Sequence, residues 1–329
     1  MSDPTFVAIL RSWSFPPTVV LGLALAAMLY GRGLRSTPRQ AQEHATRQRW
    51  RAVAYYSGLV TLAIALMSPV APLGGLLFSA HMVQHMLLAI VAAPLLVLGA
   101  PLGPVLRGLP RSVRAELVRA FLPGRPLPRA ADWVTRPVIA AAAHAVTIWF
   151  WHVPAMYDAT LRVELLHYLQ HATIFGTALL FWWPVAQPVA GRRLPHGLAL
   201  IYLTAGMVVQ HKLIGAFLTF ARQPLYPYYT QVPRLWGFSA LNDQQTAGLI
   251  MSTGGFMIIW IAFTAVFIVW AREASRDEMT GRTRHPRSQR STPTVPVATT
   301  GANGHVHANG VNGRAMDAQP ADVRGRAAP

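Results

Sequence analysis

The chain has 329 residues, of which 53% are hydrophobic and only 12% are Asp, Glu, Lys or Arg. Soluble domains carry about 25% charged residues, so this composition excludes a protein that faces water on all sides. The net charge of +17 is compatible with nucleic-acid binding, but the arginines lie between apolar runs and in a C-terminal tail. That placement is typical of membrane proteins, and we expect the chain to contact a lipid bilayer and no nucleic acid.

Seven apolar segments approach the length of a transmembrane helix, which is about 20 residues. In chain order they are Trp13–Gly31, Ala52–Pro69, Leu76–Leu98, Pro137–Val153, Leu165–Ala190, His196–Phe220 and Ala247–Ala271. Pro94 and Pro184 lie inside two of these segments and should kink them. The predicted fold class is therefore all-α: a polytopic membrane helix bundle of seven transmembrane helices, formed by residues 1–271.

The arginines are concentrated in alternate loops. Most follow the first, third and fifth predicted helices, whereas the loops between these contain few. Because basic loops stay on the cytoplasmic side, we expect the N-terminus outside and the C-terminus in the cytoplasm. Residues 272–329 are rich in Arg, Pro, Thr, Gly and Asn, which predicts a disordered basic cytoplasmic tail.

Seven histidines fall in the predicted outer halves of the third to sixth helices. By helical rise, the tier near the outer surface consists of His81, His152 and His167, and the deeper tier of His85, His144, His171 and His211. Ionisable side chains inside a membrane are costly and mark functional sites, so the seven predict one shared site. The alternative is that each histidine only hydrogen-bonds a neighbouring helix.

Two of the predicted helices carry the same motif, H-x-x-Q-H, at His81–His85 and His167–His171. Residues four positions apart lie on one helix face, so each pair of imidazoles can bind one metal ion. Gln84 and Gln170 lie beside the same faces, and we expect each to hydrogen-bond an imidazole and fix its tautomer.

Copper suits the side chains that this sequence offers. The chain has no cysteine, which excludes thiolate ligands. Imidazole binds copper, zinc, iron and nickel, and thioethers favour Cu(I), so Met82 and Met86 are candidate accessory ligands. A haem-binding redox protein is the alternative, and its haem would be held by histidines of different helices, for example His85 and His171.

Two charged residues lie near the predicted site. Lys212 follows His211 directly, and we expect it to extend towards the outer surface or to face a water-filled cavity, as in a copper or proton transporter. Asp243 begins the seventh predicted helix, either as its N-cap or as a carboxylate that receives the metal ion. The sequence contains no nucleophile triad or phosphate loop, so we do not expect an enzyme.

Several of these segments resemble one known family. They are Phe78–Pro101, Trp151–Pro154 with Tyr157 and Asp158, Leu166–Ala172, Phe181–Pro184 and Asp243–Met251. In this combination the chain resembles the CtaG family of multi-span assembly factors for bacterial caa-type cytochrome c oxidase.

The resemblance implies a multi-pass plasma-membrane protein that acts in respiratory chain biogenesis. It implies oxidase subunits as partners and a role in copper delivery. The residues that it carries over are His81, His85, His152, His167, His171 and Asp243. The case for His144, His211 and Lys212 depends on their predicted depth alone.

Overall fold

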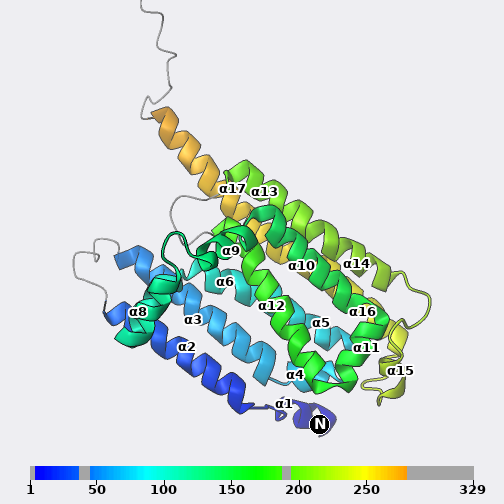
Figure 1. Ribbon diagram of the computed structural model, residues 1–329. Helices are drawn as coiled ribbons and strands as arrows, with labels where there is room; N and C mark the ends of the chain where they lie inside the picture. The colour runs from blue at the N-terminus through cyan, green and yellow to red at the C-terminus, as the bar shows by residue number, and fades with distance from the viewer. Residues whose placement is uncertain (1–3, 37–44, 187–193, 280–329) are drawn as a thin grey trace, which may run out of the picture. The chain divides into compact units, whose positions relative to one another are not determined.

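The computed structural model describes residues 4–36, 45–186 and 194–279 (Figure 1). These residues form α-helices, short π-helical segments and loops, and the described ranges contain no β-strand. The predicted all-α class is confirmed. The helix α17 (Gly255–Met279) continues past Ala271, where the predicted transmembrane domain ends, because Arg, Glu, Ala and Met favour helix there. The rest of the predicted tail, residues 280–329, lies outside the described residues.

Four helical stretches in the described chain are long and apolar enough to cross a membrane. They are α2 (Pro17–Arg35), Thr46–Met67 within α3 (Ala45–Met67), Phe78–Leu98 and His196–Thr219. A fifth is obtained if α10 (Pro137–His152) and α11 (Pro154–Arg162), which are bent by 74° at their junction, form one span. The predicted total of seven spans and the predicted orientation remain predictions.

The Phe78–Leu98 stretch consists of α5 (Phe78–Met86), the π-helix η2 (Leu87–Ala92) and α6 (Ala93–Leu98). The His196–Thr219 stretch consists of α13 (His196–Leu203), the π-helix η3 (Thr204–Val208) and α14 (Val209–Thr219). The seventh predicted helix consists of α16 (Ala240–Leu249), the π-helix η4 (Ile250–Gly254) and α17. The fifth predicted helix corresponds to α12 (Glu164–Ala186). The shorter helices are α1 (Pro4–Leu10), α4 (Val70–Gly74), α7 (Leu102–Gly108), α8 (Arg111–Ala120), α9 (Pro126–Val134) and α15 (Tyr228–Gln231).

Prolines set several helix boundaries. Pro137 and Pro154 begin α10 and α11, where a missing N–H costs nothing and the fixed φ suits a helix. The first long helix begins at Pro17 and not at Trp13 as predicted, since a residue before a proline is disfavoured in helical conformation. Pro94 follows η2, where the lost hydrogen bond is accommodated by π-helical winding, whereas α12 continues through Pro184.

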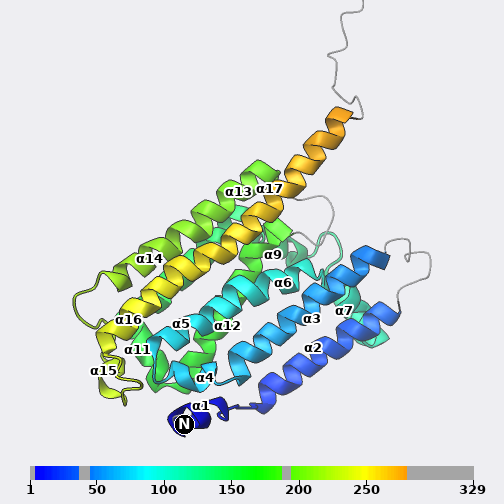
Figure 2. The ribbon, with the colours of Figure 1, turned by 180° about the vertical axis from the view of Figure 1, so that it is seen from behind.

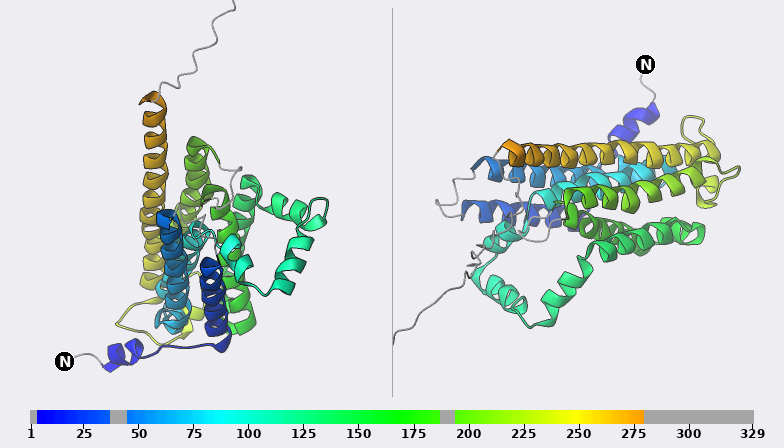
Figure 3. Two further views of the ribbon diagram at one scale, coloured as in Figure 1. Left: turned by 90° about the vertical axis from the view of Figure 1, so that its left-hand side faces the viewer. Right: turned by 90° about the horizontal axis from the view of Figure 1, so that it is seen from above.

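The stretch α5–η2–α6 occupies a central position in the bundle. It packs against α3, α12 and α16 (Figure 2). Helix α10 packs on α12, and α14 packs on α16. The short helices α8 and α9, between residues 111 and 134, lie beside the long helices in both views of Figure 3. Side chains of the α5–η2–α6 stretch can therefore contact those of three neighbouring helices.

Glycines allow α14 and α16 to approach closely. A Cβ atom built on Gly248 would lie 2.6 Å from the carbonyl oxygen of Gly215, and one built on Gly215 would lie 2.7 Å from the carbonyl oxygen of Gly248. Both distances are too short for a side chain. In membranes no hydrophobic effect drives helices together, and small residues at their contacts allow the backbones to pack closely.

Candidate metal centre

The two H-x-x-Q-H motifs meet between α5 and α12. Within each motif the ring centroids lie close together, 4.4 Å apart for His81 and His85 and 4.3 Å apart for His167 and His171. Between the helices, the centroids of His85 and His171 are 5.1 Å apart, and those of His81 and His167 are 5.2 Å apart. Four of the predicted histidines therefore share one site.

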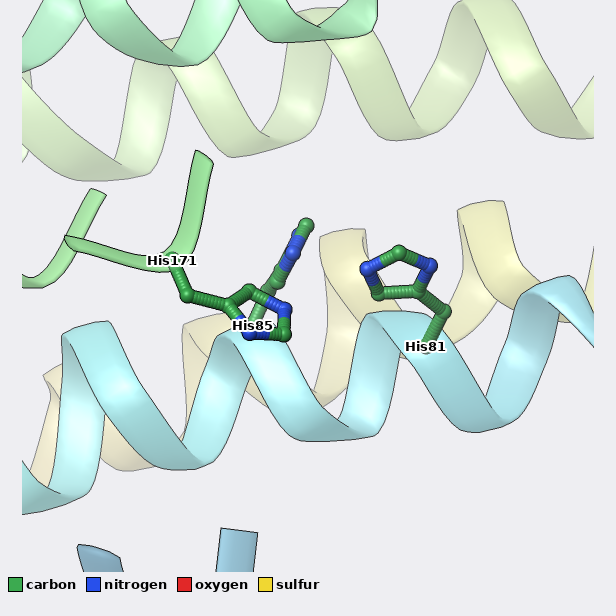
Figure 4. A group of neighbouring side chains, drawn as sticks. All are labelled: His81, His85 and His171. Carbon is green, nitrogen blue, oxygen red and sulfur yellow. The ribbon is translucent and has the colours of Figure 1, made fainter. Parts of the chain in front are cut away.

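Three of these four meet most closely. His81, His85 and His171 each offer one ring nitrogen, and the three atoms lie within 4.8 Å of one another (Figure 4). In the described part of the chain, this is the one group of three or more histidine or carboxylate side chains with that geometry. Three nitrogens bound to one ion at about 2.0 Å lie about 3.5 Å apart, so a movement of each ring by less than about 1 Å would close the site.

The rings of this cluster carry unpartnered nitrogens. His81, His85 and His171 are 0%, 5% and 9% exposed. Nε2 of His81 and His171, and both nitrogens of His85, are buried without a hydrogen-bond partner, as is Nε2 of His167. A buried polar atom without a partner costs about 1–3 kcal/mol. Buried polar atoms are normally hydrogen-bonded, and an ion or a water bound among these nitrogens would supply the partners that they lack.

Tyr229 fixes the tautomer of His81. The Tyr229 hydroxyl donates to the carbonyl oxygen of Gly74 at 2.7 Å, so it accepts from Nδ1–H of His81 at 3.3 Å. Burial raises the pKa of this hydroxyl well above its ordinary value, so the proton that it donates stays in place. Nε2 of His81 then keeps its lone pair for a metal ion. Hydrogen bonds to the other ring nitrogen orient metal-binding histidines in this way.

The remaining three predicted histidines lie on α10 and α14. Nδ1 of His152 donates to the Ile148 carbonyl at 2.7 Å, and Nδ1 of His211 donates to the Met207 carbonyl at 2.8 Å. Both bonds fix the tautomer with the lone pair on Nε2. The Tyr157 ring contacts both His152 and the cluster. Its centroid lies 6.2 Å from that of His152 and 5.2 Å from that of His81.

His144 is oriented in the same way. Its Nδ1 lies 3.2 Å from the Thr177 hydroxyl, which donates its own proton to the Thr173 carbonyl and so accepts from His144. The group of three close ligand atoms does not include His144, His152 or His211. The structure thus brings four of the seven rings together and leaves three on neighbouring helices, and metal binding by the seven stays a prediction.

The two motif glutamines do not orient imidazoles. The Gln84 amide donates to the carbonyl oxygen of Ala65 at 2.9 Å, and neither polar atom of the buried Gln170 side chain has a hydrogen-bond partner. The predicted bond from Gln84 to an imidazole is wrong, because the Gln84 amide donates instead to Ala65 of α3. Met82 and Met86 are buried in the apolar core around the cluster.

Asp243 caps a different helix from the one predicted. The N-cap of α16 is Ser239, whose hydroxyl accepts from the backbone N–H of Asn242. Asp243 is buried, and its two oxygens accept from the backbone N–H groups of Phe78 and Ser79 at 2.6 and 3.1 Å. Asp243 thus caps α5, the helix that carries His81 and His85, and a negative charge suits that helix end.

The structure also shows the surroundings of Lys212 and Tyr229, which the sequence does not determine. Lys212 is exposed, and its Nζ lies 4.6 Å from the centroid of the Phe256 ring, a cation–π contact. It therefore packs against α17. Tyr229 had no signal in the sequence, because it lies in the short helix α15, outside the predicted transmembrane helices, and contacts His81 only through the fold.

The fold and this cluster define an all-helical protein with several membrane-length apolar helices and a buried histidine site. Residues 28–273 match the family described as cytochrome c oxidase caa3 assembly factor (Caa3_CtaG). The match covers most of the chain, and the chain belongs to this family. The predicted resemblance is confirmed.

The chain is also similar to mycobacterial proteins. It is 25% identical over 280 residues to the uncharacterized protein Mb0105 of Mycobacterium bovis, and this alignment covers 83% of this chain and 41% of that protein. It is 29% identical over 240 residues to the uncharacterized protein ML1998 of Mycobacterium leprae, and this alignment covers 69% of this chain and 35% of that protein. The chain thus spans about two fifths of the length of these relatives. No solved structure matches it.

Proposed function

We propose that the chain is a non-enzymatic assembly factor that binds copper at His81, His85 and His171 and delivers it to a cytochrome c oxidase. The observation that carries this proposal is the set of three ring nitrogens within 4.8 Å of one another in a buried site. The family supports the oxidase as the recipient of the copper ion. The ion is cargo here, so the site must both bind it and release it.

The chemistry of the ligands supports copper. The cluster consists of imidazoles, and the chain has no cysteine. Magnesium and calcium prefer oxygen ligands, and among divalent first-row metals a nitrogen site binds copper most tightly. Three neutral imidazoles also suit Cu(I), and the His167 ring stands next to His171 at a centroid distance of 4.3 Å.

The geometry favours an ion over a haem. A haem held by His85 and His171 would need its ring between the two imidazoles. Their centroids are only 5.1 Å apart, and the rings of His81 and His167 stand at similar distances around them. A single ion fits between these rings, whereas a macrocycle would displace them.

Metal binding by the purified full chain tests the proposal. The apo protein in detergent is titrated with Cu(I) under anaerobic conditions, in competition with a chromophoric chelator, and the bound metal is measured after gel filtration. We expect about one ion per chain. The double variant His85→Ala/His171→Ala should lose it.

The matched control is His196→Ala. His196 lies 3.7 Å from Glu273, outside the cluster, and this variant should bind like the wild type. A cell that carries the double variant should assemble less copper-loaded oxidase than one that carries the control. Equal copper binding by the double variant and the wild type would refute the site.

A further inference from the structure

A cavity of about 450 Å³ leads from the surface to the histidine cluster. It is bounded by the start of α2 and the segment before it, by α3, α4 and η2, and by the first turns of α12. Its polar side chains are Glu164, His167, Tyr168 and His171 of α12, Gln84 of α5 and Ser14 before α2. The cavity therefore connects an exposed carboxylate with a residue of the metal centre.

The polar residues of α12 form a graded series along this cavity. Glu164, His167 and His171 are spaced by three and four positions, so they share one helix face. Glu164 is exposed, His167 is half-buried and His171 is buried. At 1.5 Å per residue, the series spans about 10 Å along the axis. From His171 the next rings are His85 and His81, at centroid distances of 5.1 and 5.6 Å.

The outermost residue of the series is held in place. The Tyr168 hydroxyl donates to Oε1 of Glu164 at 2.6 Å, which restricts the carboxylate at the mouth of the cavity. Asp243, the carboxylate that the sequence suggested as the receiving ligand, is buried with both oxygens bonded to α5. Glu164 is thus the acidic side chain that lines this cavity.

Unpartnered polar atoms along the cavity point independently to a ligand. Gln84 is only 2% exposed, yet its Oε1 has no hydrogen-bond partner. Nε2 of His171, which is also buried, and Nε2 of His167 have none either. These three atoms belong to residues that line the same cavity, so a passing ion would find free lone pairs from its mouth to the cluster.

We infer that this cavity is the port through which the metal ion reaches and leaves the cluster, with Glu164 as the receiving ligand and His167 as the relay to His171. The inference rests on the proposed function. Each step exchanges one metal–ligand bond for another: the Glu164 oxygen is replaced by Nε2 of His167, and that bond by Nε2 of His171. The ion keeps its oxidation state, and no further reactant is needed.

Loading kinetics separate the port from the site. Cu(I) bound to a water-soluble chromophoric chelator is mixed with the apo full chain, and its transfer is followed by absorbance. A fixed charge at a cleft raises the rate of cation association by a factor of ten or more. Glu164→Gln should therefore slow loading about ten-fold. Its copper content at equilibrium should remain that of the wild type, because the three cluster histidines are intact.

Two further variants complete the test. Ala172→Trp places an indole in the cavity without removing a ligand, and it should also slow loading. Glu116→Gln, an exposed carboxylate on α8, is the control and should load at the wild-type rate. Wild-type rates in both Glu164→Gln and Ala172→Trp would overturn the port while the proposed site stands. Failure of the wild type to bind copper would overturn both proposals.

Discussion

Oδ2 of Asp243 lies 2.6 Å from the backbone nitrogen of Phe78, so α16 holds the first turn of α5 through a buried carboxylate. This bond joins residues 165 positions apart in the chain. It fixes the start of the helix that presents His81 one turn later and His85 two turns later. The position of two proposed metal ligands thus depends on a helix that provides none of them.

Substitution of Asp243 should loosen both the fold and the site. Hydrogen bonds to charged groups contribute about 1.5–3 kcal/mol each, so Asp243→Ala should lower the free energy of unfolding by about 2 kcal/mol or more. We expect a lower midpoint of thermal unfolding in detergent and weaker copper binding. Asn242→Ala, an exposed neighbour, should change neither. An unchanged midpoint for Asp243→Ala would show that the cap is dispensable.

Tyr229 should tune copper affinity without contacting the ion. Tyr229→Phe keeps the ring but removes the hydroxyl that accepts from His81 and donates to Gly74. Loss of such a partner weakens metal binding by about 10–100-fold, so competition with a chelator should give a correspondingly higher Kd. Tyr228→Phe alters the adjacent tyrosine, which faces Arg162, and should bind copper normally. Equal affinities would mean that His81 needs no orienting bond.

The sequence predicted the class of this fold because hydropathy depends only on local composition. The α10 start at Pro137 and the extent of the sixth predicted helix, His196–Phe220, agree with the structure to within a residue. The histidine spacing within each H-x-x-Q-H motif also required only one helix. These features are local, and local sequence determines them.

The contacts between helices could not be predicted in this way. Helical rise assigned His144 and His211 to the same depth as His85, but depth does not say which helices are neighbours. The bond from Gln84 to Ala65 and that from Asp243 to Phe78 also depend on the packing of α5 between α3 and α16. Tyr229 and Glu164 were missed for the same reason.

The histidines outside the close group should not be needed for copper binding. His144 and His211 each place Nδ1 in a hydrogen bond, but neither belongs to the three rings that share ligand distances. His144→Ala and His211→Ala should therefore each retain the wild-type copper content, whereas His85→Ala should lose it. Metal analysis of the three purified variants decides between a compact and an extended site. Loss of copper in His211→Ala would extend the site to α14.

The close contact of α14 and α16 should make Gly248 sensitive to a single methyl group. A Cβ atom there would lie 2.4 Å from the Thr219 hydroxyl oxygen and 2.7 Å from the Thr219 backbone nitrogen. Overpacking typically costs about 1–3 kcal/mol, so Gly248→Ala should lower the thermal midpoint. Gly176→Ala on α12 is the matched control, since nothing lies within 4 Å of its Cβ position. Alanine favours helix over glycine by about 1 kcal/mol, so this control should be neutral or stabilising. Because α16 also carries Asp243, the Gly248→Ala variant should bind copper less tightly as well, and equal midpoints for the two variants would contradict the contact.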